Sequence, residues 1–125
     1  MNNPHLALVL LSCATVAVPV MAKRRAPKPV VPLVLEGVRY SVPHDFLMGV
    51  VLATDVKTRT VLWHRQIYTV RIDPNLETDV QASYITRLKA EPGKLVVAND
   101  RGFTYQLDLA TLQVEAVTGP LVVQR

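Results

Sequence analysis

One pattern occurs twice in this chain, and it limits the folds open to the chain more than any other feature. Two segments, GVVLATDVKT from residue 49 and GFTYQLDLAT from residue 102, carry glycine, aspartate and threonine at the same spacing, 53 residues apart. Val61 and Val114 continue the match beyond the threonines. Self-similarity at such a period is typical of repeat architectures. We therefore expect a fold built from two related units.

The hydrophobic pattern predicts strands. Between Phe103 and Leu109 apolar and polar residues alternate strictly, so one face of that strand should be buried. A strand at 94–98 precedes it, and Asn99 to Gly102 supply the turn of a hairpin. Further strands are predicted at 38–42, 49–55, 60–72, 80–88 and 114–118. No window keeps a helical period, so the prediction is an all-β fold, an antiparallel meander of about six to seven strands.

The repeated polar residues are suited to turns. An aspartate at the end of a strand accepts hydrogen bonds from the backbone N–H groups of the following turn, and a threonine three residues later braces the same loop. A glycine at the start of the strand tolerates a positive φ. We therefore predict structural roles for Gly49, Asp55, Thr58, Gly102, Asp108 and Thr111.

Residues 53–63, ATDVKTRTVLW, resemble the blade motif of quinoprotein-like (pyrroloquinoline-quinone-type) β-propellers, which runs Ala-x-Asp-x-x-Thr-Gly-Lys-x-x-Trp. Arg59 stands where the family has glycine, and Thr60 where it often has lysine. In that family the tryptophan packs between adjacent blades, so the resemblance implies a core role for Trp63. The matching residues are Ala53, Asp55, Thr58 and Trp63.

The second copy of this motif is weaker. It keeps Asp108 and Thr111, but Leu112 replaces the glycine and Ala116 the tryptophan. The resemblance covers residues 45–65 and 94–116 and implies one to two blade-like repeats. A propeller closes with about four or more four-stranded blades, and this chain has room for about two. We therefore expect no closed propeller and carry over no quinone, metal or catalytic residue.

The first 22 residues are predicted to be a targeting segment. Leu6 to Ala22 is apolar apart from two hydroxyl residues, and Val20-Met21-Ala22 suits cleavage by signal peptidase after Ala22. A periplasmic or secreted protein is the prediction. Two alternatives stay open: a membrane anchor, because positive charge follows the segment and none precedes it, and a lipoprotein acylated at Cys13.

The positive charge of the chain is concentrated in one short segment. Residues 23–32 (KRRAPKPVVP) form a basic, proline-rich linker, and residues 33–125 form a single predicted β domain. The net charge is +4, and four basic residues lie in the linker: Lys23, Arg24, Arg25 and Lys28. The predicted domain is therefore neutral, which argues against nucleic acid as a partner. The linker is either a spacer or an arm that lies close to anionic lipid head groups.

Candidate chemistry is sparse. Asp73, Glu77 and Asp79 place oxygen ligands at intervals, as a calcium loop would, but Thr78 and Tyr84 stand where such a loop needs glycine and a bidentate glutamate. His44 and His64 lack a close metal-ligand spacing. No nucleophile elbow or phosphate loop is present in the sequence. We therefore predict no enzyme and no cofactor, and only a weak metal site at residues 73–79.

These observations favour a small exported β-repeat protein that acts as a non-catalytic interaction or structural module. An open meander leaves edge strands whose N–H and C=O groups are unpaired, and such edges pair with other chains. We therefore expect self-association or a protein partner. The alternative is a small-ligand or metal-binding envelope protein that uses the loop at 73–79.

Overall fold

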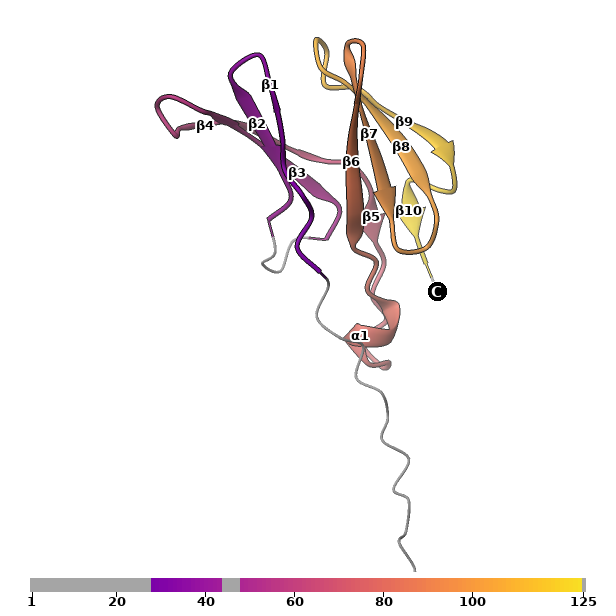
Figure 1. The fold of residues 1–125 in the computed structure, drawn as a ribbon. Helices are drawn as coiled ribbons and strands as arrows, with labels where there is room; N and C mark the ends of the chain where they lie inside the picture. Colours follow the sequence, from indigo (N-terminus) through magenta and orange to yellow (C-terminus); the bar gives the residue numbers. More distant parts are fainter. Residues whose placement is uncertain (1–27, 44–47, 125) are drawn as a thin grey trace, which may run out of the picture.

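The computed structural model describes residues 28–43 and 48–124, and these residues form an all-β structure in which two four-stranded sheets lie side by side (Figure 1). Both large sheets are antiparallel meanders, as predicted, and the described residues close neither a barrel nor a propeller. The strands of the first sheet are β1 (Leu33–Leu35), β2 (Val38–Ser41), β3 (Val50–Asp55) and β4 (Val61–Gln66).

The second sheet repeats this order. Its strands are β6 (Ile85–Glu91), β7 (Lys94–Asn99), β8 (Thr104–Asp108) and β9 (Val114–Thr118). Between the two sheets the chain forms β5 (Thr69–Val70) and one helical turn, α1 (Thr78–Gln81), and the chain ends in β10 (Val122–Val123). The described residues thus contain ten strands, more than the six to seven expected, because β1, β5 and β10 are only two or three residues long.

One predicted strand is wrong in its first half. Residues 80–88 were expected to be extended throughout, but α1 occupies the start and β6 begins only at Ile85. The buried side chain of Gln81 explains the difference: its amide nitrogen donates to the carbonyls of Asp73 and Glu77, and its oxygen accepts from the Asp73 N–H. This amide ties the loop back on itself and stops the chain from extending.

The predicted targeting segment, 1–22, and most of the linker at 23–32 lie outside the described residues. Within the described part of the linker, Val30 is buried in the hydrophobic core, so packed structure begins before the predicted boundary at residue 33. No helix in the described parts of the chain is long and apolar enough to cross a membrane.

The core lies between the two large sheets. The first sheet contributes Val51 and Ala53, and the second contributes fully buried side chains from β7 and β8, which alternate with more exposed ones as the pattern at 103–109 predicts. Tyr68, which precedes β5, stacks on Tyr105 of β8 at a centroid distance of 5.1 Å. The core residues of β7 and β8 are Leu95, Val97, Tyr105 and Leu107.

Short parallel pairing joins the two ends of the repeat. β10 pairs with β5 so that Val122 lies opposite Thr69 and Val123 opposite Val70. Each pair is separated by 53 residues (122 − 69 and 123 − 70), the spacing of the sequence repeat. Each unit therefore consists of a four-stranded meander followed by a short strand, and the two short strands pair with each other in register.

Candidate functional site

The repeated aspartates form two matching turns. The Oδ1 atom of Asp55 accepts hydrogen bonds from the backbone N–H of Lys57 at 2.8 Å and of Thr58 at 3.0 Å. In the second unit the Oδ1 atom of Asp108 accepts from Ala110 at 2.8 Å and Thr111 at 2.9 Å. The carboxylates are thus engaged inside the turns, as the sequence predicted.

Hydrogen bonds from the turn lower the pKa values of both carboxyls. For Asp55 the N–H of Thr58 and then that of Lys57 hold the pKa below its ordinary value. For Asp108 the N–H of Thr111 and then that of Ala110 have the same effect. The donors favour the charged carboxylate, so the ionised form is the one that the turns stabilise.

The threonines and the positions after them also match. The hydroxyl of Thr58 accepts from the Thr60 N–H at 3.4 Å, and that of Thr111 accepts from Gln113 at 3.3 Å. The following residues, Arg59 and Leu112, both have a φ of 60°. This left-handed conformation is the one in which glycine is favoured. The place where the blade motif has glycine is therefore left-handed in both copies, although neither copy has glycine there.

The repeat extends further than the sequence pattern showed. The Val56 N–H donates to the Gly37 carbonyl at 3.0 Å, and the Leu109 N–H donates to Gly93 at 3.0 Å. Each first hairpin is thus held against the aspartate turn of its own unit. These glycines are 56 residues apart (93 − 37), three more than the main repeat, because the β2–β3 connection is longer than the β7–β8 connection. A search that allowed one gap would have found them.

The two repeated glycines have different structural requirements. Gly49 and Gly102 have φ values of 75° and 78°. A Cβ atom on Gly49 would collide with the carbonyl oxygen of Tyr68, whereas one on Gly102 would meet no atom within 4 Å. A side chain at position 49 is therefore excluded by the close Tyr68 carbonyl as well as disfavoured by the positive φ.

Trp63 packs against the core from the first sheet. Register places Tyr40 opposite Ala53 and Ala53 opposite Trp63, so the three share one face. The two rings lean toward each other over the small alanine, with centroids 5.9 Å apart. Trp63 is half-buried, and its strand neighbour Arg65 donates from Nε to the Leu112 carbonyl at 2.9 Å. This face of the first sheet, its inner face, is turned toward the second sheet.

The equivalent row of the second sheet contains two polar residues and points away from the core. Two residues before Asp108, Gln106 takes the place that Ala53 has before Asp55, and Gln106 pairs with Val96 and Glu115. The inner face of the second sheet is the opposite one, which carries Leu95 and Leu107. The two equivalent sheets therefore stack head to tail.

A shifted bulge decides which side chain stands in the place of Trp63. The irregular pairing falls between Ala53 and Thr54 in the first sheet but between Thr104 and Tyr105 in the second. By sequence spacing the equivalent of Trp63 is Ala116, but by sheet pairing it is Glu115. The outer face of the second sheet therefore carries the acid Glu115 at the position that corresponds to the indole ring of Trp63 in the first sheet.

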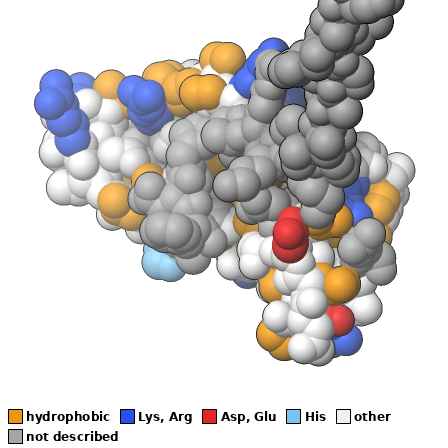
Figure 2. All heavy atoms as spheres, turned by 90° about the horizontal axis from the view of Figure 1, so that it is seen from below, with side chains coloured by type: hydrophobic (Ala, Val, Ile, Leu, Met, Phe, Trp, Pro, Cys, Tyr) orange, Lys and Arg blue, Asp and Glu red, His pale blue; other side chains and the backbone are white. Residues whose placement is uncertain are grey.

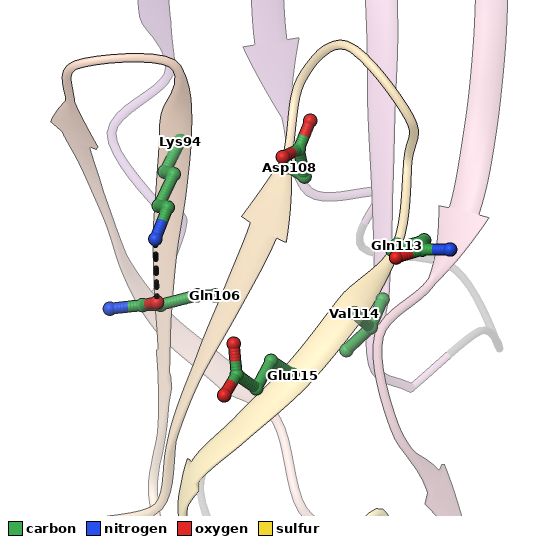
Figure 3. Close-up of a pocket in the computed structure, with 6 residues that line it drawn as sticks. All are labelled: Lys94, Gln106, Asp108, Gln113, Val114 and Glu115. Carbon is green, nitrogen blue, oxygen red and sulfur yellow. Dashed lines mark hydrogen bonds between the residues drawn. The ribbon is translucent and has the colours of Figure 1, made fainter.

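This outer face contains a shallow polar cavity of about 310 Å³ (Figure 3). Lys94 Nζ donates to the side-chain oxygen of Gln106 at 3.5 Å across it, and Glu115 lies on the neighbouring strand. Polar outer faces are typical of the terminal units that cap repeat stacks. We interpret the face as such a cap, since acid, amide and ammonium groups stand where the first sheet has apolar side chains.

A second, larger groove lies between the sheets at their hairpin end. Its volume is about 660 Å³. Apolar side chains from both sheets line it, and Glu36 and Glu91 stand among them. Burial, and then the charge of Glu36, raise the pKa of the Tyr40 phenol that lines the groove. The apolar lining residues include Leu35, Val38, Tyr40, Ala90, Pro92 and Leu109.

The predicted acidic loop forms an ordinary turn around its first residue. Asp73 Oδ1 accepts from the Asn75 N–H at 2.9 Å, and Glu77 lies exposed before α1. Across the described residues, no three His, Cys, Asp or Glu side chains come close enough to hold a metal ion. The side chain of Asp79 and the whole of His44 are outside the description, and His64 is exposed on β4.

Seen from below, hydrophobic side chains stand in separate groups among basic and acidic ones (Figure 2).

Comparison with models of known protein families gives no match, and comparison with curated protein sequences gives none either.

Proposed function

We propose that this chain is a non-catalytic structural or interaction module of the cell envelope or the secreted fraction. One observation carries the proposal: the two units stack head to tail, so the outer faces of the two described sheets differ in chemistry. At one end the first sheet exposes Val34, Val61 and Leu62, with exposed fractions of 60%, 58% and 50%. Each large sheet also ends in an edge strand, and unpaired edges bind other chains.

The repeated motif supports a scaffold in a second way. The side chains of Asp55, Thr58, Asp108 and Thr111 all bind the backbone of their own turns. The polar groups that the sequence repeats are therefore used to shape the chain. The left-handed backbone at Arg59, in the place of the family glycine, supports the resemblance to quinoprotein-like blades, which we retain as part of the proposal.

To test the proposal, the chain is isolated from the cells that make it after mild cross-linking. The masses of the mature chain and of any protein cross-linked to it are then measured. We expect a chain that lacks residues 1–22, cross-linked to another protein or to a second copy. A mass that retains residues 1–22 would contradict export by cleavage. A chain that is monomeric at high concentration and free of partners would contradict an interaction role.

Calorimetric titration of the same preparation with calcium and zinc tests the metal-binding alternative. Heat from stoichiometric binding that disappears in Asp73→Asn would favour that alternative over the proposed module. We expect no such heat, because the carboxylate of Asp73 already accepts a hydrogen bond within its own turn.

A further inference from the structure

We propose that the groove between the hairpin ends of the two sheets binds the basic segment 23–28 of a second copy of this chain. The inference rests on the proposed function and names its partner. Apolar side chains make up most of the lining of the groove, and the charged groups in that lining are Glu36 and Glu91. The groove therefore suits a positively charged segment that also has apolar side chains.

The backbone at Glu36 gives independent support for an acid at this rim. Glu36 and Gly37 have φ values of 49° and 77°, so both central residues of this two-residue hairpin are left-handed. Such a turn favours Asn-Gly or Asp-Gly, and a glutamate is disfavoured there. The equivalent hairpin has Pro92 before Gly93 and avoids the problem, because only the glycine has positive φ. Strained residues that persist in a fold are concentrated at functional sites.

The segment 23–28 has the complementary chemistry. It contains four basic residues in six positions, and prolines at 27, 29 and 32 favour an extended, polyproline-like chain. An extended segment of this kind loses little conformational entropy on binding, and proline-rich segments bind in grooves with aromatic linings. Tyr40 supplies an aromatic ring in the groove, and the two glutamates can pair with the arginines.

The geometry favours a segment from another copy over the chain's own. The described chain begins at residue 28, and the start of its indigo ribbon lies at the end of the molecule away from the β1–β2 hairpin (Figure 1). Residues 23–27 extend at most about 18 Å from Lys28, and prolines oppose a reversal of direction. We therefore assign the segment to the groove of a second copy and not to the groove of its own chain.

The first experiment is charge reversal in the whole chain, followed by sedimentation velocity over a range of concentrations at low salt. One variant is Glu36→Lys/Glu91→Lys, and the other is Lys23→Glu/Arg24→Glu/Arg25→Glu. We expect each to dimerise about tenfold more weakly or worse than the unmodified chain, because each places like charges together. Mixing the two variants should restore a dimer, since each then offers the charge that the other needs.

Glu36→Asn keeps the test valid if charge reversal impairs folding. Asparagine suits the left-handed position, so this variant should unfold at a higher denaturant concentration than the unmodified chain, yet dimerise more weakly. As a matched control, Glu115→Gln on the outer face of the second sheet should leave dimerisation unchanged.

The outcomes separate the groove from the wider proposal. If the unmodified chain stays monomeric, or if mixing the reversed variants restores nothing, the groove assignment is wrong. If the chain dimerises and all variants dimerise equally well, the groove assignment is also wrong, but the interaction role stands and another surface is responsible. If a peptide of unrelated basic sequence displaces the dimer as well as a KRRAPKPVVP peptide does, the groove binds basic peptides in general and the second copy is not its particular partner.

Discussion

At the scale of single residues, the left-handed position after each repeated threonine can be tested directly. Arg59 is exposed, and its φ is 60°. We expect Arg59→Gly to raise the free energy of unfolding by about 0–1 kcal/mol, because glycine adopts this φ without the steric cost that a side chain has. Urea unfolding measures the change. The control Lys57→Gly, in the same turn without a positive φ, should lower stability. A loss of stability in Arg59→Gly would mean that the arginine makes a contact of its own.

The carboxyls of Asp55 and Asp108 predict how stability depends on pH. Both pKa values are lower in the folded chain than their ordinary value of 3.8. Their stabilising effect is therefore fully present above that value and is lost as the pH falls through the lower folded pKa values. We expect the double variant Asp55→Asn/Asp108→Asn to lose less stability than the unmodified chain between pH 5 and pH 2, in unfolding experiments with urea. Equal slopes for the two proteins would contradict this assignment.

Trp63 tests the packing of the first sheet. The ring is half-buried beside Tyr40, so Trp63→Ala should cost about 2–3 kcal/mol, less than the 3–5 kcal/mol usual for a fully buried ring. Circular dichroism during urea unfolding measures this loss. His64→Ala, at the exposed neighbouring position, should cost less than about 0.5 kcal/mol. A cost below about 1 kcal/mol for Trp63→Ala would place the ring on the surface and remove the basis for a blade-like role.

At the scale of elements, the pairing of β10 with β5 offers a matched pair of substitutions. Val123 is fully buried, whereas its neighbour Val122 is 42% exposed. Val123→Ala should lower the free energy of unfolding by about 1–2 kcal/mol through lost burial and an incompletely filled cavity. Val122→Ala should change it by less than about 0.5 kcal/mol. Equal effects in urea unfolding would show that β10 is not packed against the core.

The elements also show how far sequence reasoning reaches. Strands at 94–98 and 114–118 and the hairpin between β7 and β8 were predicted correctly, because alternation and turn residues are local signals. The turn roles of Asp55 and Asp108 follow from the same kind of signal. The helical turn at 78–81 was missed because it depends on Gln81 binding a loop eight residues away.

The groove and the head-to-tail stacking could not be predicted from the sequence. They depend on which face of each sheet is buried against the other, and strict alternation at 103–109 says only that one face is buried. The gap of three residues in the repeat also hid the equivalence of Gly37 and Gly93, so that the two hairpins at the groove were not recognised as a pair.

At the scale of the whole molecule, one core shared by both sheets implies one unfolding transition. Trp63 is the only tryptophan and reports on the first sheet, whereas Leu107 is fully buried in the second. Leu107→Ala should cost about 2–4 kcal/mol and shift the midpoint of Trp63 fluorescence as far as that of circular dichroism. A Trp63 midpoint that stays in place while the circular dichroism shifts would mean that the two sheets unfold independently.

The shifted bulge has a practical consequence for anyone who wishes to lengthen this stack. Grafting a further unit onto the second sheet requires an apolar row on its outer face, and an alignment of the two halves by residue number would put the new tryptophan at Ala116. Strand pairing puts Ala116 opposite Tyr105, on the inner face of the second sheet, so a ring there would face away from the added unit, whereas one at Glu115 would face it. The position of the bulge in the second sheet thus decides which residue of β9 would contact an added unit.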